Sequence, residues 1–365
     1  MLDTSFWKKR KVFITGHTGF KGGWLCLLLE QLGAKVWGYA LKPSTEPSLC
    51  DIIEVKKIAK TTLADINDLS ALKKAMRAAS PEIVIHMAAQ ALVRESYAKP
   101  VDTYATNVMG TVHVLEAVKD CNSVRAVINV TTDKCYKNKQ WIWSYRENEP
   151  LGGFDPYSTS KACSELVTSA YRDSFFNPEN YKNHGVALAS ARAGNVIGGG
   201  DWAKDRLIPD CVRAVMNGEK ILIRNPKSVR PWQHVLEPLT GYLMLAEKLY
   251  NKGPQFGEAW NFGPSEDDMK PVNWIASKIS LQLGGSLDLL KSGKKGRLHE
   301  AATLKLDSSK ARQVLCWHPR WNLEKAVDMT LEWYSAWQQG IDMHKFAACQ
   351  IATYQQGLPR VSETL

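Results

Sequence analysis

The first half of the chain alternates short apolar runs with longer stretches in which apolar residues recur every three or four positions. Short β-branched runs are typical of buried strands, and the longer spacing is typical of helices packed on one side. Strands are predicted at Lys11–Thr15, Val36–Ala40, Ile83–His86 and Val124–Val130. Helices are predicted at Phe20–Gly33, Leu69–Ala79 and Pro100–Val118. Because the strands are apolar throughout and alternate with helices, we expect a doubly wound α/β fold, with a parallel sheet covered on both faces.

The regular alternation weakens beyond about Gly194. Glycines cluster at Gly198–Gly200, prolines recur, and helices are predicted at Leu236–Tyr250 and Leu323–Gln338. No low-complexity tract or long polar linker interrupts the chain, so we expect two closely packed lobes with a cleft between them. The predicted first lobe comprises residues 1–193 and a returning segment near 234–252. The predicted second lobe, smaller and of mixed α/β structure, comprises residues 194–365 and is interleaved with the first.

Composition limits the class of protein. The chain has 365 residues, of which 44% are hydrophobic, enough for a large core. No apolar run approaches the roughly 20 residues that a membrane span needs, and Met1–Arg10 lacks the apolar segment of a signal peptide. Eight scattered cysteines without Cys-x-x-Cys spacing argue against a zinc site or a disulfide framework. We therefore expect a cytoplasmic protein without membrane contact and without a bound metal.

The formal net charge of +10 raises the question of nucleic-acid binding. The basic residues are spread among acidic ones, and aromatic residues do not alternate with them. A solvated basic surface, assisted by an anionic small substrate, is therefore favoured over an RNA-binding role. A salt-sensitive bandshift would test the RNA alternative.

A glycine-rich turn, T-G-H-T-G-F-K-G at positions 15–22, lies between the first predicted strand and the first predicted helix. Its three glycines allow the backbone to approach a pyrophosphate, whose charge the free N–H groups of the helix N-terminus can bind. Because strand, glycines and helix follow in the required order, a Rossmann-type dinucleotide site is favoured over a turn without a ligand. The residues of the turn expected to contact the dinucleotide are Gly16, His17, Gly19, Phe20 and Gly22.

The second predicted strand ends without an acidic residue. In many dinucleotide sites such a residue holds the ribose hydroxyls of NAD, but Gly38–Lys42 reads Gly-Tyr-Ala-Leu-Lys. The residues themselves therefore leave NAD and NADP open. Lys42 suits a 2′-phosphate, although a solvated lysine explains it at least as well.

Tyr157 and Lys161 lie four residues apart behind Phe154-Asp155-Pro156, a typical helix start, so their side chains share one helix face. A free tyrosine, with a pKa of about 10, is a poor base at neutral pH. A nearby ammonium and the positive charge of an oxidised nicotinamide favour the phenolate, which makes the pair suited to proton transfer. The same spacing occurs in many helices as a surface pair, so this interpretation depends on the glycine-rich turn upstream.

The segment Thr131-Thr132-Asp133-Lys134 directly follows the strand that ends at Val130. In a doubly wound sheet the carboxyl ends of the strands border the ligand crevice. Thr132 is expected to hydrogen-bond a sugar hydroxyl, and the adjacent acid and base can support chemistry beyond hydride transfer. Without the other motifs, a solvated turn pair would explain Asp133 and Lys134 better.

Together these motifs resemble the extended short-chain dehydrogenases/reductases, and over about Phe6 to Gln338 the chain resembles the nucleotide-sugar 4,6-dehydratases. Further matching segments are His86–Arg94, Ala193–Trp202 and Arg230–Val235. The dTDP-glucose enzymes have Asp-Glu where this chain has Asp-Lys, and Asp-Lys is the pattern of the CDP-glucose enzymes. The resemblance also implies cofactor contacts by Asp65, Ile66, Ala88, Ala89, Asn107, Tyr157 and Lys161.

The resemblance implies NAD as cofactor and CDP-glucose as substrate. Tyr157 would take the proton of the 4-hydroxyl while hydride leaves carbon 4, and the ketone would acidify carbon 5. Loss of water from carbons 5 and 6 and return of the hydride to carbon 6 would give CDP-4-keto-6-deoxyglucose. As a working hypothesis, Asp133 is the acid and a neutral Lys134 is the base. By analogy, the reaction is an early step toward dideoxysugars of bacterial surface polysaccharide.

Substrate contacts are expected mainly from the second lobe. Asn195 is expected to contact the sugar or a phosphate, and Arg230 the pyrophosphate, because a planar guanidinium binds phosphate oxygens bidentately. Arg206 is a weaker candidate, for which a structural ion pair is an equal alternative. The resemblance adds Gln90, Arg94 and Thr132.

Two other functions and the assembly stay open. A nucleotide-sugar epimerase or reductase shares the glycine-rich turn and the Tyr/Lys pair but does not need the adjacent Asp133 and Lys134. A catalytically silent dinucleotide-binding regulator does not need the catalytic residues together. The resemblance further implies a homodimer or homotetramer, in which the helices at Pro100–Val118 and Tyr157–Phe176 form a four-helix bundle with their copies.

Overall fold

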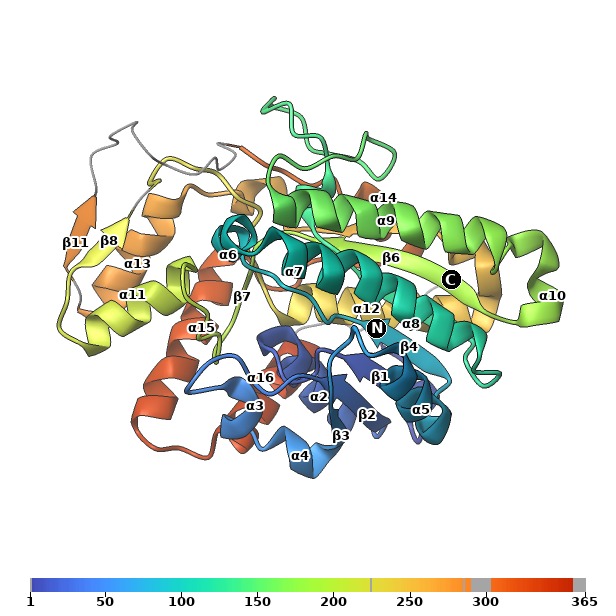
Figure 1. Cartoon of the computed structure of the whole chain (residues 1–365). Helices are drawn as coiled ribbons and strands as arrows, with labels where there is room; N and C mark the ends of the chain where they lie inside the picture. The colour runs from blue at the N-terminus through green and yellow to red at the C-terminus, as the bar shows by residue number, and fades with distance from the viewer. Residues whose placement is uncertain (1, 224, 285, 290–302, 357–365) are drawn as a thin grey trace, which may run out of the picture.

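The computed structural model describes residues 2–223, 225–284, 286–289 and 303–356. Its centre is a seven-stranded parallel sheet with the order β10-β6-β5-β4-β1-β2-β3 (Figure 1). The strands are β1 (Lys11–Thr15), β2 (Lys35–Ala40), β3 (Ala59–Leu63), β4 (Ile83–His86), β5 (Ala126–Val130), β6 (Ala187–Ala193) and β10 (Ala259–Phe262). The strand order reverses between β1 and β4, where a ligand crevice is expected. The predicted doubly wound parallel sheet is confirmed.

Helices cover both faces of this sheet. One face packs against α5 (Leu69–Ala79), α8 (Gly110–Lys119) and α9 (Pro156–Ser174). The other face packs against α2 (Phe20–Gln31) and α12 (Leu236–Lys252). Short helices complete this part of the chain: α1 (Thr4–Trp7), α3 (Leu49–Ile52), α4 (Val55–Ile58), α6 (Val93–Ala98) and α10 (Tyr181–His184).

The helix predicted at Pro100–Val118 is not regular along its length. The chain forms α7 (Pro100–Tyr104), then a π-helical stretch at Ala105–Met109, and only then α8. The wider stretch carries Asn107, whose side chain bonds the backbone of the loop after β4. Such wide turns often mark functional regions, and hydrophobic spacing alone does not reveal them.

Three strands of the large sheet were not predicted from the sequence. The edge strand β3 reads Ala-Lys-Thr-Thr-Leu, and only its first residue is buried, so it lacks an apolar pattern. The buried strand β6 carries alanine at every second position, where small side chains leave room for neighbouring elements. Strand β10 pairs with β6 although it follows it by more than sixty residues. Non-local pairing of this kind leaves no local signal.

The part of the chain after β6, which corresponds to the predicted second lobe and is called so below, contains two small parallel sheets and several helices among its described residues. Strand β8 (Ile221–Ile223) pairs with β11 (Leu287–Leu289), and β7 (Val196–Ile197) pairs with β9 (Gln233–His234). The helices are α11 (Leu207–Met216), α13 (Val272–Leu283), α14 (Ser309–Leu315), α15 (Leu323–Gln338) and α16 (Met343–Gln356). The chain returns to the large sheet through α12 and also through β10, which lies beyond the returning segment expected near 234–252.

In the part of the chain that the structure describes, no helix is long and apolar enough to span a membrane. The same residues contain no group of three or more histidine, cysteine, aspartate or glutamate side chains arranged to hold a metal ion. All eight cysteines are free thiols.

Candidate active site

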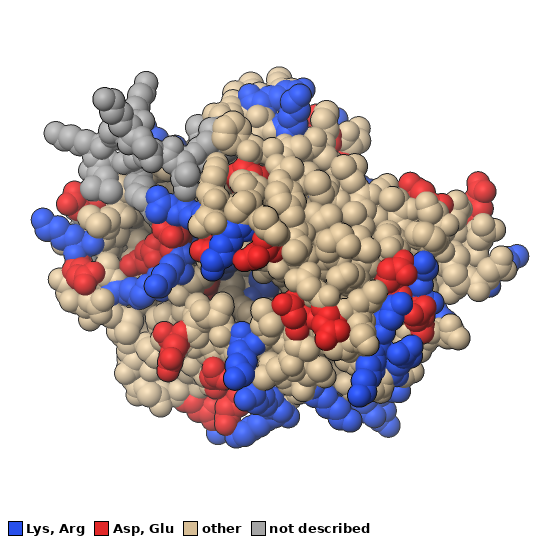
Figure 2. Space-filling view, in the orientation of Figure 1, with Lys and Arg blue, Asp and Glu red and all other residues tan. Residues whose placement is uncertain are grey.

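A cavity of about 1700 Å³ lies at the carboxyl ends of the central strands and extends to α11 and β8 in the second lobe. Figure 2 shows a hollow in this face of the molecule, with acidic and basic side chains around it. The glycine-rich turn, the segment after β5 and the start of α9 all line this cavity. The structure therefore brings the three predicted motifs together in one site.

The glycine-rich turn has the shape of a pyrophosphate cradle. Gly16 has φ +77°, and a Cβ there would come within 2.7 Å of the backbone nitrogen of Ala88. A Cβ on Gly22 would come within 2.3 Å of the carbonyl oxygen of Gly16. Gly19 begins α2 without a side-chain cap, and a Cβ there would meet no atom closer than 3.4 Å. The first N–H groups of α2 are thus available to an anion, as the pyrophosphate of NAD requires.

His17 lies beneath the cradle and not in the cavity wall. Its ring is fully buried, with Nε2 3.1 Å from Oγ1 of Thr61. The ring packs so closely on β2 that a Cβ at Gly38 would come within 2.3 Å of it. Burial lowers the pKa of His17 to about 4, so the ring is neutral near pH 7. This side chain, expected at the dinucleotide, instead supports the turn from below.

Asn107 also lies outside the cavity wall. Its amide accepts from the Gln90 N–H at 2.9 Å, donates to the Gln90 carbonyl at 3.0 Å, and donates to Oγ of Ser160 at 2.8 Å. The Gln90 side chain lines the cavity, but its own amide bonds Thr103 and the backbone of Leu92. Asn107 therefore holds the loop after β4 against α9, and the Gln90 side chain links the same loop to α7. The ligand contacts expected of both residues stay predictions.

The other predicted cofactor contacts line the cavity as expected. These residues are Phe20, Asp65, Ile66, Ala88 and Ala89. Tyr39 donates its hydroxyl to the Asp65 carbonyl at 2.8 Å, which holds the end of β3 against the end of β2. The residues present therefore fit a dinucleotide along the carboxyl ends of β1, β2, β3 and β4.

Tyr157 and Lys161 are both buried and both line the cavity. Lys161 donates from Nζ to the Val130 carbonyl at 3.2 Å, and burial lowers its pKa to about 8. Burial raises the pKa of Tyr157 to about 12, against the hydrogen bond with Thr132 and the positive charge of Arg206. The sequence predicts that a neighbouring ammonium, aided by the oxidised nicotinamide, favours the phenolate. In the protein without ligands, desolvation is the largest influence on this pKa, so the phenolate depends on positive charge from Arg206 and from a bound ligand.

The segment after β5 forms a short 3₁₀ turn, Asp133–Cys135, capped by Thr132. Thr132 donates to Oδ1 of Asp133 at 3.0 Å, and Nζ of Lys134 lies 3.6 Å from the same oxygen. Thr132 and Lys134 line the cavity, whereas Asp133 is fully buried directly behind them. Its Oδ2 has no hydrogen-bond partner among the described residues. A buried carboxyl oxygen of this kind is costly unless a ligand or a proton satisfies it.

The predicted substrate residues face this set from the second lobe. Asn195 accepts from Nζ of Lys134 at 3.3 Å. Arg206 forms a structural ion pair, the alternative to a substrate contact: its Nη1 lies 2.8 Å from Oδ2 of Asp201. Arg206 also lines the cavity. Arg230 is buried in the cavity wall, and its Nη1 donates to the Val229 carbonyl at 2.9 Å.

Arg94 lies at the edge of the cavity on α6. Its Nη1 is 3.3 Å from Oδ1 of Asp205, which belongs to the loop before α11. Both side chains are substantially exposed, so this pair contributes little stability on its own. The predicted substrate contact of Arg94 therefore competes with an ion pair between the two lobes.

A family model described as GDP-mannose 4,6 dehydratase matches residues 13–330. A CDP-glucose 4,6-dehydratase of Salmonella typhimurium is 53% identical over 360 residues, which covers 99% of this chain and 100% of that relative. The chain belongs to this family of nucleotide-sugar 4,6-dehydratases. A dTDP-glucose 4,6-dehydratase of Xanthomonas campestris is 25% identical, over 90% of this chain and 95% of its own.

Solved structures share the fold of this dehydratase. A dTDP-glucose 4,6-dehydratase from Bacillus anthracis, in complex with NAD, is 21% identical with a TM-score of 0.71, covering 89% of this chain and 96% of that one. A UDP-glucose 4-epimerase from Thermotoga maritima, with UDP-glucose, is 22% identical with a TM-score of 0.74. The match covers 89% of this chain and 98% of that one. Because a dehydratase and an epimerase share the fold, the fold alone does not select the reaction.

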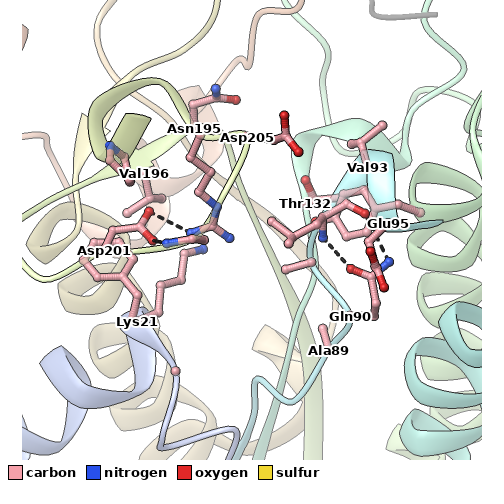
Figure 3. A pocket seen from close by; sticks show the side chains of 18 of the residues that line it. Lys21, Ala89, Gln90, Val93, Glu95, Thr132, Asn195, Val196, Asp201 and Asp205 are labelled. Carbon is pink, nitrogen blue, oxygen red and sulfur yellow. Dashed lines mark hydrogen bonds and ion pairs between the residues drawn. The ribbon is translucent and has the colours of Figure 1, made fainter. Parts of the chain in front are cut away.

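Two charged residues of the dehydratase site, Lys21 and Asp201, were not predicted from the sequence. Lys21 extends from the start of α2 into the cavity beside Asp201 (Figure 3). Asp201 is the ion-pair partner of Arg206. Burial lowers the pKa of Lys21 to about 7, and the positive charges of Arg206 and Lys161 act in the same direction. A lysine inside an otherwise apolar helix start was the available signal for Lys21.

Proposed function

We propose that the protein converts CDP-glucose to CDP-4-keto-6-deoxyglucose with NAD as a cofactor that is regenerated in every turnover. The observation that carries this proposal is one cavity wall in which Thr132 and Lys134, with Asp133 behind them, adjoin Tyr157 and Lys161. An oxidation needs the tyrosine and lysine, and an elimination needs the additional acid and base. The full-length likeness to a CDP-glucose 4,6-dehydratase supports CDP-glucose as the substrate.

The first step is oxidation at carbon 4 of glucose. Tyr157 accepts the proton of the 4-hydroxyl, and Thr132, which bonds Tyr157, orients the same hydroxyl. When bound, NAD accepts the hydride from carbon 4 and later returns it to carbon 6. Because burial raises the Tyr157 pKa to about 12, this proton transfer requires the positive charges gathered around the ring. Arg206 is the cation of the chain that lowers this pKa, and a bound oxidised nicotinamide would add a second positive charge.

The second step removes water across carbons 5 and 6. The 4-ketone acidifies the hydrogen on carbon 5, which Lys134 removes as a base while Asp133 protonates the departing 6-hydroxyl. Asp133 is fully buried and its Oδ2 has no hydrogen-bond partner among the described residues, so this is the oxygen that would act on the 6-hydroxyl. After the hydride returns to carbon 6, Lys134 gives its proton back to carbon 5. To close the cycle, Tyr157 releases to solvent the proton that it took from the 4-hydroxyl, and Asp133 takes one proton from solvent, so that both residues return to their starting states.

Arginine and amide side chains of the second lobe would hold the nucleotide diphosphate. Arg206 and Arg230 are the cations suited to the pyrophosphate, and Asn195, next to Lys134, is suited to the sugar. A bidentate guanidinium contact would fix the sugar relative to Tyr157, and such positioning contributes much of the rate in enzymes of this kind.

The decisive experiment supplies purified protein with CDP-, dTDP-, GDP- or UDP-hexose, with and without added NAD. We expect a 4-keto-6-deoxy product from CDP-glucose and loss of activity when bound NAD is removed. A UDP- or CDP-hexose that changes only its configuration at carbon 4 would show an epimerase instead.

For the elimination step, Lys134→Ala is expected to stop exchange of the carbon 5 hydrogen with deuterated solvent. Exchange at the normal rate in that variant would exclude Lys134 as the base.

Self-association through α7, α8 and α9 is part of the proposal. Large apolar side chains are exposed on α7 and the π-helical stretch after it, at Val101, Tyr104 and Met109, and on α9 and its C-cap, at Leu166 and Phe175. An apolar surface of this kind on a helix pair is typical of a contact between copies. Light scattering of the purified protein is expected to show a dimer or tetramer, and Leu166→Glu to shift it toward the monomer. A wild-type protein that is monomeric at micromolar concentration would contradict this assembly.

We also place the enzyme in the cytoplasm. Its eight cysteines are all free thiols, and two of them, Cys316 and Cys349, are exposed. Proteins of oxidising compartments rarely keep so many thiols unpaired. Fractionation of cells that produce the protein would test this location.

A further inference from the structure

The end of β2 forms the wall of the cavity where the adenosine ribose of a dinucleotide lies. In doubly wound folds, a residue about 20 positions after the last cradle glycine contacts the ribose 2′-oxygen, and an acidic side chain there favours NAD. At this distance from Gly22 the chain carries Lys42. Ala40, Leu41, Lys42, Ser44 and Thr45 all line the cavity, and none of them is acidic.

This segment is held in a fixed position relative to the pyrophosphate cradle. Thr18, inside the glycine-rich turn, donates its hydroxyl to the Leu41 carbonyl at 2.9 Å. Gly16 donates its N–H to the Tyr39 carbonyl at 2.9 Å. Lys42 therefore follows directly after a backbone position that is bonded to the cradle. Its side chain is exposed at the rim of the cavity, and the backbone before it is fixed.

An acidic residue of the cavity wall, Asp65, follows the neighbouring strand β3. Its Oδ1 accepts from both the backbone N–H and the side-chain amide of Asn67, at 2.9 and 3.1 Å, so one of its oxygens is engaged by its own loop. The ribose end of the cavity thus offers one ammonium and two hydroxyl side chains, which is the chemistry that a phosphate monoester prefers.

We propose that the residues at positions 40–45 form a subsite for a 2′-phosphate, so that the enzyme binds NADP as well as NAD. Lys42 supplies the charge, and Ser44 and Thr45 supply hydroxyl donors. None of the lining residues at positions 40–45 carries a carboxylate that would repel a 2′-phosphate. The proposal also fits the proposed reaction, in which the dinucleotide is regenerated in every turnover and no reductant from outside is consumed.

Equilibrium binding tests this subsite without relying on catalysis. The probes are the pair 2′,5′-ADP and 5′-AMP, which differ only in the 2′-phosphate, and the pair NADP and NAD, each titrated by calorimetry. We expect wild-type protein to bind 2′,5′-ADP more tightly than 5′-AMP, and NADP within about tenfold of NAD, since a charge-assisted contact offsets the cost of holding the phosphate. NADP binding more than about a hundredfold weaker than NAD binding would overturn the proposal.

Three variants separate the subsite from the general positive charge. Lys42→Ala is expected to weaken NADP and 2′,5′-ADP about tenfold and to leave NAD within twofold. The matched control is Lys35→Ala, at an exposed lysine at the other end of β2. It should leave the affinities for NADP, 2′,5′-ADP and NAD unchanged. Leu41→Asp, at a side chain that is 59% exposed, should repel the 2′-phosphate without disturbing the core. Equal weakening of NAD and NADP by Lys42→Ala would overturn the proposal.

The same experiments keep this inference separate from the proposed function. If NAD supports dehydration of CDP-glucose while NADP and 2′,5′-ADP fail to bind, the 2′-phosphate subsite is wrong and the dehydratase function stands. If NADP binds but no nucleotide sugar is dehydrated, the subsite stands and the proposed function is wrong.

Discussion

The cofactor side of the cavity is formed mainly by backbone groups, whereas the substrate side is formed mainly by side chains. The cofactor side depends on backbone: three glycines within seven residues and the N–H groups that begin α2. The substrate side depends on side chains that come from α2, from the turn after β5, from the loop after β6 and from the start of α11. Backbone shape is specified by neighbouring residues, whereas the convergence of distant side chains is specified by the whole fold. Disturbing one side should therefore give a different phenotype from disturbing the other.

The largest effect is expected at the cofactor side from Gly22→Ala. A Cβ there would lie 2.3 Å from the Gly16 carbonyl oxygen and 2.6 Å from Cα of His17, so the backbone itself must move. We expect a loss of about 4 kcal/mol or more in the free energy of unfolding, and no measurable NAD binding. Chemical denaturation and calorimetry measure the two effects.

Gly19→Ala is the matched control for that variant. A Cβ at Gly19 would meet no protein atom closer than 3.4 Å, so the variant should fold with normal stability. Its methyl group would occupy the space above the start of α2, where the pyrophosphate approaches. We therefore expect weaker NAD binding in a stable protein. Loss of stability equal to that of Gly22→Ala would contradict the comparison.

Tyr157→Phe is expected to lower kcat roughly 1000-fold, because it removes the group that exchanges the proton of the 4-hydroxyl. The ring and its packing stay, so the free energy of unfolding should change little, and NAD should still bind, although Tyr157 is also an expected cofactor contact. Steady-state kinetics with CDP-glucose and a binding titration test both statements. Normal turnover by this variant would exclude the mechanism given above.

Asp201→Asn should affect the substrate side alone, and more moderately. It removes the charge that pairs with Arg206 at 2.8 Å, while the amide oxygen can still accept from the Ala203 N–H. With Arg206 less well positioned, the KM for CDP-glucose should rise about tenfold with little change in kcat. The affinity for NAD is the control, and a parallel loss of NAD binding would mean that the two sides are not independent.

The smallest effect concerns pH and the support of the cradle by His17. Burial lowers the folded-state pKa of His17 to about 4 from 6.5, so between these values the unfolded chain binds more protons. Stability from this residue is therefore present above pH 6.5 and is lost as the pH falls toward 4. From pH 7.5 to 5.5 the loss is roughly 1 kcal/mol. His17→Gln should show a smaller decrease over the same range in denaturant titrations, and an identical decrease would contradict this assignment.

The predicted elements show where local pattern is sufficient. The bounds of β1, β4 and α5 agree with prediction, because apolar runs and helical spacing are local consequences of burial. The π-helical stretch around Asn107 and the polar edge strand β3 were not predicted, because neighbouring elements decide both. The same holds for β10, whose partner β6 is distant in the chain.

The amino-acid sequence by itself determined the glycine-rich turn, the shared helix face of Tyr157 and Lys161, and the place of Thr132 at a strand end. Each depends on conformations within a few residues, which side-chain type restricts directly. Only the tertiary structure decided that the His17 side chain is buried beneath the glycine-rich turn, and that Lys21 extends toward Arg206 and its partner Asp201. These outcomes depend on which residues meet across the fold, and burial and electrostatics act there over distances that sequence spacing does not encode.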